Sequence, residues 1–124
     1  MAQTTLRDSA ATRRRLLQAA REEFTERGIA GARVDRIGLA ANANKAQIYH
    51  YFGDKDGLFD AVLERFTEEA VGAVAIDADD LPGYAARLFD YHFDHPGLLR
   101  LVTWARLEGR TTPSTQAPSS SLFH

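Results

Sequence analysis

The stretch that decides the fold is Asn42–Phe59, which reads NANKAQIYHYFGDKDGLF. Asn42 suits a turn, because asparagine tolerates the left-handed backbone conformation better than most residues. Asn44 suits the N-cap of a helix, because its side-chain oxygen can accept from the unpaired N–H groups of the first turn. Ile48 and Phe52 lie four residues apart and share one helix face, which predicts that both point into a core. The pattern predicts a turn, a short helix ending near Phe52, a second turn and the start of a longer helix.

The opposite face of this short helix is polar and aromatic. The residues that face away from the core, or flank that face, are Lys45, Ala46, Gln47, Tyr49, His50 and Tyr51. In the DNA major groove, glutamine can pair with adenine and lysine with guanine. The alternative interpretation is an ordinary solvated helix surface. We favour contact with a partner, because the preceding segment completes a DNA-binding motif.

That preceding segment supplies the first half of a helix-turn-helix. Val34, Ile37 and Ala41 recur at helical spacing and can pack on Ile48. The link Asn42–Asn44 has the length of roughly three or four residues that such a motif needs. In this arrangement the second helix enters the DNA major groove and the first helix crosses the backbone.

The chain resembles the DNA-binding domain of tetracycline-repressor (TetR) family transcriptional regulators in three segments, TRRRLLQAAREEFTERG, ARVDRIGLAANANKAQIYHYF and GDKDGLFDAVL. A weaker similarity, to the fifth and sixth helices of some members, continues through HFDHPGLLRLVTWARLE. The resemblance implies an all-α fold: a three-helix head with the helix-turn-helix, a linking fourth helix and a partial two-helix C-terminal body. It also implies a sequence-specific DNA-binding transcriptional regulator, specifically an effector-responsive repressor.

The resemblance also assigns candidate functional residues. Arg33 stands where the family usually has a threonine that caps the second helix, and arginine can reach a phosphate but cannot cap. Lys55 occupies the family's phosphate-contact position. The full set of predicted DNA contacts is Arg33, Arg36, Asn44, Lys45, Ala46, Gln47, Tyr49, His50, Tyr51 and Lys55. The candidate effector pocket consists of Tyr91, His92 and Trp104, and no catalytic residue, metal ligand or cofactor is expected.

The partners implied are double-stranded operator DNA and a small-molecule effector, with no membrane contact. Family members are homodimers, but the helices that usually form the dimer interface are absent from this sequence. We therefore expect a weakly DNA-binding monomer, or association through the last two helices in another geometry. The second of these helices is expected to carry more apolar residues than one buried stripe can hold, namely Leu98, Leu99, Leu101, Val102 and Trp104.

Composition and charge restrict the class of protein. The chain has 124 residues, 44% of them hydrophobic and 26% charged, as in an ordinary soluble domain. It has no cysteine, which excludes disulfides, and no apolar run long enough to span a membrane, so we expect a cytoplasmic protein. The net charge is −2, yet residues 1–55 hold ten Lys/Arg and six Asp/Glu, a net of +4, whereas residues 56–124 carry a net of −6. A basic N-terminal half beside an acidic remainder is typical of a DNA-binding head on a body that avoids phosphates.

The sequence divides into four predicted segments. Residues 1–11 and 109–124 read as disordered tails. Residues 12–53 read as the helix-turn-helix domain, with Thr12 capping its first helix, and residues 54–108 read as the linker helix and partial body.

Individual residues predict where the helices begin and end. Gly28 should end the first helix in a left-handed conformation. Asp54 and Asp80 should cap the fourth and fifth helices. Pro96 should separate the fifth helix from a sixth, which runs to about Glu108.

Other functions remain open from the sequence alone. A second candidate is a truncated helical interaction module that pairs with a full-length relative. His92 and His95 have metal-ligand spacing, but no third ligand is evident nearby. Asp77, Asp79 and Asp80 lack the remaining ligands of a calcium loop. An enzyme is the least favoured class, because no catalytic constellation is present.

Overall fold

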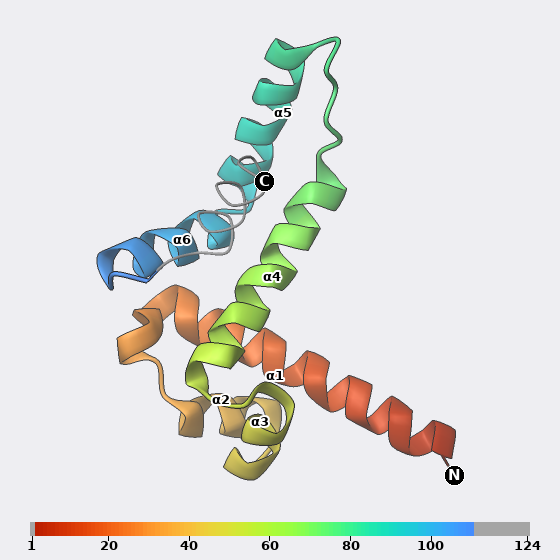
Figure 1. Ribbon diagram of the computed structural model, residues 1–124, viewed down its shortest axis with the longest axis vertical. Helices are drawn as coiled ribbons and strands as arrows, with labels where there is room; N and C mark the ends of the chain where they lie inside the picture. Colours follow the sequence, from red (N-terminus) through yellow and green to blue (C-terminus); the bar gives the residue numbers. More distant parts are fainter. Residues whose placement is uncertain (1, 111–124) are drawn as a thin grey trace, which may run out of the picture.

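The computed structural model describes residues 2–110, and describes side chains from residue 8 onward. That part of the chain contains six α-helices and no strand, which confirms the all-α prediction (Figure 1). In chain order the helices are α1 (Ala2–Gly31), α2 (Val34–Ala41), α3 (Lys45–Phe52), α4 (Lys55–Ala73), α5 (Leu81–Asp94) and α6 (Gly97–Leu107).

Helix α1 differs from its prediction at the start. It begins at Ala2, so the described residues of the predicted 1–11 tail are helical. Thr12 consequently lies inside the helix and caps nothing; its hydroxyl donates to the carbonyl of Asp8 at 2.8 Å. The predicted tail at 109–124 lies mostly outside the described residues.

Gly28 interrupts the far end of α1, as predicted. Its φ of 74° belongs to the left-handed region, where glycine has no Cβ to clash. Residues 29–31 then form a separate helical turn. A Cβ at Gly28 would lie 2.5 Å from the Trp104 ring of α6, so a glycine here also permits the close approach of the two helices.

The core of the head is built from apolar side chains that recur at helical spacing. Leu16, Ala20 and Phe24 of α1 are buried against Ile37 of α2 and Ile48 of α3. The remaining core residues of the head come from α4 and include Leu58, Phe59 and Val62. The rings of Phe24 and Phe59 meet edge to face with centroids 5.3 Å apart. Helix α4 therefore contributes to the core of the head and also connects the head to α5 and α6 (Figure 1).

The predicted turn residues behave as expected. Asn42 has φ 53° and ψ 48° at the end of α2. The carboxylates of Asp54 and Asp80 accept from the backbone N–H groups of Gly57 and Gly83, at the starts of α4 and α5. Gly38 lies in the last turn of α2, just before the turn at Asn42. A Cβ there would lie 2.7 Å from the Ala43 carbonyl oxygen, so the glycine makes room for the turn.

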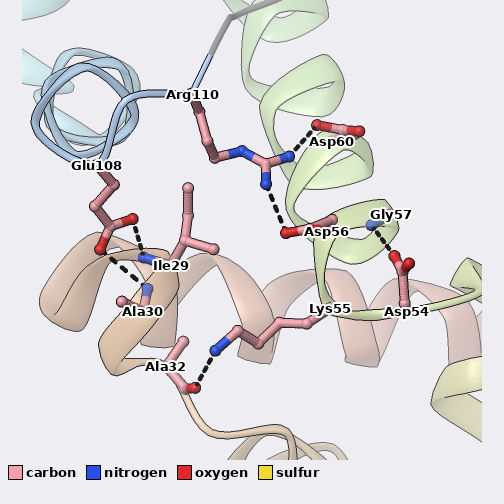
Figure 2. Close-up of polar contacts among 10 residues, drawn as sticks. All are labelled: Ile29, Ala30, Ala32, Asp54, Lys55, Asp56, Gly57, Asp60, Glu108 and Arg110. Carbon is pink, nitrogen blue, oxygen red and sulfur yellow. Dashed lines mark hydrogen bonds and ion pairs between the residues drawn. The ribbon is translucent and has the colours of Figure 1, made fainter.

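Helix α6 is joined to the head through the residues that directly follow its end (Figure 2). The Glu108 carboxylate accepts from the N–H groups of Ile29 and Ala30, at 3.0 Å each. Arg110 forms ion pairs with Asp56 at 2.6 Å and with Asp60 at 3.0 Å. These contacts fix the end of α6 against both α1 and α4.

Helix α5 packs far more loosely than the others. None of its residues is buried, and Phe89 and Phe93 are 68% and 76% exposed. On α6, Leu101 and Ala105 are buried while Leu99 and Leu107 face solvent. The predicted excess of apolar residues on this helix is therefore present.

Candidate nucleic-acid interface

Helix α3 presents its polar face outward because a single apolar residue anchors it. Ile48 is fully buried, and Phe52 is half-buried against the same core. Asn44 starts the helix with a reciprocal capping box. Its side-chain oxygen accepts from the N–H of Gln47 at 2.8 Å, and the Gln47 side-chain oxygen accepts from the N–H of Asn44 at 3.0 Å.

The predicted base-reading residues lie together on this outer face. The exposed side chains are those of Lys45, Gln47, Tyr49 and His50. The short side chain of Ala46 beside them would let a partner approach the helix backbone closely. The Oε1 of Gln47 is occupied by the capping box, which leaves its amide N–H groups to donate. The Nζ of Lys45 lies 3.5 Å from Asp35, an exposed pair that contributes little to stability.

Tyr51 differs from its neighbours because it is half-buried. Its ring meets His50 edge to face at 5.3 Å between centroids and lies 6.2 Å from Phe52. The ring therefore packs along the side of the helix and supports His50.

Two arginines of α2 occupy different environments. Arg33 is exposed at the N-cap position and makes no side-chain cap, as the sequence predicted. Arg36 instead pairs with Glu23 of α1, with its Nε and Nη2 each 2.9 Å from the same carboxylate oxygen. The structure thus places Arg36 in an internal tie between α1 and α2.

This tie changes the ionisation of Glu23. Burial disfavours its charged form, but hydrogen bonds from Arg36 and from the Arg33 N–H, with the charges of Arg36 and Arg27, outweigh that effect. The pKa of Glu23 is consequently held below its usual value.

Lys55 is also tied inside the head. Its Nζ donates to the Ala32 carbonyl at 3.0 Å (Figure 2). The half-buried amine therefore joins the start of α4 to the loop before α2, and it retains two further protons for another acceptor.

Sequence reasoning missed two residues that lie beside the helix-turn-helix. The guanidinium of Arg13 lies over the Phe52 ring at 5.3 Å. The Nε of Arg15 donates to the carbonyl of Ala41 at the end of α2, at 3.1 Å. The signal was present in the run Arg13–Arg15, directly before the buried Leu16.

Comparison with known proteins identifies this architecture. The family model described as bacterial regulatory proteins of the tetR family matches residues 16–62, and that for a tetracyclin repressor-like C-terminal domain matches residues 80–122. The chain belongs to the TetR family. The resemblance noted in the sequence is therefore confirmed.

Relatives of the TetR-family chain include named repressors. This chain is 49% identical over 102 residues to the HTH-type transcriptional repressor SCO4008 of Streptomyces coelicolor. The match covers 82% of this chain and 53% of that protein. It is 32% identical to the HTH-type transcriptional repressor NicS of Pseudomonas putida, covering 77% of this chain and 49% of NicS. The chain thus spans about half the length of the curated relatives it matches.

A solved structure has the same fold. The crystal structure of SCO4942 from Streptomyces coelicolor is 45% identical and superposes with a TM-score of 0.74, covering 90% of this chain and 58% of that one. The chain therefore shares its all-α architecture with a solved structure that is titled a transcriptional regulator.

The candidate effector residues do not surround one cavity in this TetR-family chain. Tyr91 lines a cleft between the end of α4 and α5, and its ring stacks on His95 at 4.6 Å. Trp104 lies elsewhere, because its indole N–H donates to the carbonyl of Thr25 at 3.1 Å. His92 has a buried Nδ1 without a hydrogen-bond partner in the described structure.

The described residues contain neither a candidate membrane span nor a cluster of metal ligands. No helix among them is long and apolar enough to cross a membrane. Within residues 2–110, no group of three or more His, Cys, Asp or Glu side chains is arranged to hold a metal ion.

Proposed function

We propose that this chain is a sequence-specific DNA-binding transcriptional regulator that inserts α3 into the major groove. The proposal rests on the way in which α3 is anchored and capped. Ile48 anchors one face in the core, and the capping box of Asn44 and Gln47 fixes the first turn, so the opposite polar face is held rigidly outward. A rigid helix with exposed donors suits base readout in the groove.

The readout would divide among three side chains. Lys45 can donate to guanine, and His50 is free to contact a base or a phosphate. Gln47 keeps its amide N–H groups available while its oxygen stays in the capping box. Gln47 would therefore act as a single donor to an acceptor such as a purine N7, whereas the bidentate adenine pair would require the capping box to open.

Phosphate contacts would hold the head in register. Arg33 is exposed beside the start of α2, Arg13 lies over Phe52 next to α3, and Lys55 has two protons left. Phosphate contacts position a protein without reading sequence, and they make binding salt-dependent. Arg36 contributes indirectly by fixing α2 to α1 through Glu23.

We further propose repression as the mode of action and the cytoplasm as its location, because relatives at 49% and 32% identity are named transcriptional repressors. A small-molecule effector is proposed because residues 80–122 match a tetracyclin repressor-like C-terminal domain. We propose that the chain acts without catalysing a reaction, and its membership of a family of regulatory proteins supports this.

The test is selection of a preferred site from random double-stranded DNA, followed by a fluorescence-anisotropy titration with the full 124-residue chain. Gln47→Ala and His50→Ala should each reduce discrimination between the selected site and random DNA by about 0.5–1.5 kcal/mol, the value of a single hydrogen bond rather than of a bidentate pair. Arg33→Ala should weaken binding to both DNAs and reduce the salt slope by roughly one unit. Arg106→Ala, an exposed arginine on α6, is the matched control and should change neither. Equal losses on both DNAs for Gln47→Ala and for His50→Ala would reject the base-readout assignment.

A second candidate function is a helical interaction module that pairs with a full-length relative. The exposed rings of Phe89 and Phe93 on α5 favour it, because clusters of exposed apolar side chains promote association. Saturable DNA binding by the isolated chain, with site preference, would exclude pairing as its sole function.

A further inference from the structure

A cavity of about 310 Å³ lies between α1 and α4, and arginines dominate its polar lining. Arg14, Arg15 and Arg21 come from α1, and Arg65 comes from α4. Glu69 is the acidic residue among them, so the lining carries a net charge of +3. Four guanidinium groups around one carboxylate form a site with excess positive charge.

Two of these arginines are oriented by Glu69. The Nη1 of Arg21 lies 2.9 Å from the Glu69 carboxylate, and its guanidinium lies over the Phe66 ring at 3.6 Å. The Nε of Arg65 lies 3.6 Å from the same carboxylate. A single negative charge therefore serves both groups, and Arg21 is also fixed by its ring contact.

The other two arginines have no acidic partner among the described residues. Arg15 donates to the Ala41 carbonyl and to the Thr12 hydroxyl, which are neutral acceptors. Arg14 is exposed and forms no hydrogen bond or ion pair with any residue of the described chain. Guanidinium groups without an acidic partner are available to bind carboxylate or phosphate oxygens, and they can do so in a bidentate manner.

The cavity also has an apolar part. Leu17 and Val62 line it, and both belong to the core of the head. Its volume lies at the lower end of the range of roughly 300–1,000 Å³ that is typical of small-molecule sites. A purely inorganic ion would leave this apolar surface uncovered.

We propose that this cavity binds a small organic anion, with at least two negative charges on a compact apolar body. Its anionic group would lie among Arg14, Arg15 and Arg65, and its apolar part against Leu17 and Val62. Such a ligand would bridge α1 and α4 and stabilise their contact. Because α4 runs from the head into the rest of the fold (Figure 1), the ligand would also hold the head relative to α4.

Calorimetric titration of the full chain with phenyl phosphate tests the proposal without DNA. A phosphate monoester carries about 1.5–2 negative charges at pH 7, and the phenyl ring supplies the apolar body. Inorganic phosphate has the charge alone, and benzyl alcohol has the ring alone. Arg14→Gln and Arg65→Gln remove cavity charges with little effect on packing, and Arg106→Gln is the matched control on α6.

We expect saturable one-to-one binding of phenyl phosphate, and clearly weaker binding of both comparison compounds. Arg14→Gln and Arg65→Gln should each weaken the affinity about tenfold, as loss of a charge-assisted hydrogen bond implies, and Arg106→Gln should not. No saturation by about 10 mM, or equal affinity in all three variants, would overturn the site. Inorganic phosphate binding as tightly as phenyl phosphate would overturn the apolar contact. If phenyl phosphate fails to bind while Arg14→Gln weakens DNA binding, the arginines serve the DNA backbone and the proposal is wrong.

Discussion

The carboxylate of Glu108 accepts hydrogen bonds from the backbone N–H groups of Ile29 and Ala30, which lie 79 and 78 residues earlier in the chain. These N–H groups begin the short helical turn that follows the break at Gly28. The first N–H groups of a helix have no partner within it, and a negative charge there is favourable. Glu108 therefore caps an element of the head from the end of α6.

Replacement of Glu108 should show how strongly this cap joins α6 to the head. Glu108→Ala leaves the N–H of buried Ile29 without its partner and should lower the free energy of unfolding by about 1–3 kcal/mol. Urea unfolding gives the loss, and hydrogen exchange at the Ile29 amide should accelerate. Glu68→Ala, at an exposed position of α4, should change neither. Unchanged exchange at Ile29 would contradict the capping role.

Gly28 should tolerate no side chain. Gly28→Ala requires a left-handed alanine, and its Cβ would lie 2.5 Å from Cε3 of Trp104. Backbone strain and displacement of α6 together should lower stability by more than about 2 kcal/mol. Gly72→Ala is the control, because nothing lies within 4 Å of its Cβ and a helical position favours alanine. That variant should be equal to or slightly more stable than the parent in thermal unfolding, by about 0.5–1 kcal/mol. Similar melting of both variants would disprove the steric account.

Asn44 should contribute to stability through the capping box alone. Asn44→Ala removes the acceptor for the Gln47 N–H and should cost about 0.5–2 kcal/mol. Asn44→Asp keeps the acceptor and should remain within about 0.5 kcal/mol of the parent. Asn44→Asp should also weaken DNA binding, because it adds a negative charge near the residues proposed to contact DNA phosphates. Urea unfolding and anisotropy titration separate these effects, and equal destabilisation by both variants would refute the capping role.

Glu23 should make the free energy of unfolding depend on pH in the acidic range. Its pKa in the folded protein is lowered from the ordinary value of 4.5, so its stabilising contribution is present above that value. The contribution is lost as the pH falls through the folded-state pKa. Arg36→Gln removes the main hydrogen-bonding partner, so the loss of stability between neutral and acid pH should become smaller. Glu26→Gln, at an exposed position of α1, should leave the pH dependence unchanged. An identical dependence in Arg36→Gln would show that the pair does not lower this pKa.

Local patterns in the sequence determined every helix from α2 to α6. Their starts depend on short-range chemistry, as in the capping of α3 by Asn44 and of α4 by Asp54. Apolar spacing placed Ile37 and Ile48 in the core, because apolar residues on one face of a helix are buried together. The start of α1 was missed, because residues 2–11 have no apolar stripe to identify a helix.

The tertiary structure alone decided which charged side chains pair between different helices. Nothing near Arg36 in the sequence indicates its pairing with Glu23, and nothing near Lys55 indicates the Ala32 carbonyl. Long charged side chains reach partners on other helices, and those partners are brought near only when the helices pack. For the same reason, the link from Glu108 to Ile29 and the arginine-lined cavity between α1 and α4 exist only in the folded chain. The sequence determined which residues are buried, because burial follows local periodicity, while packing determined which charges meet.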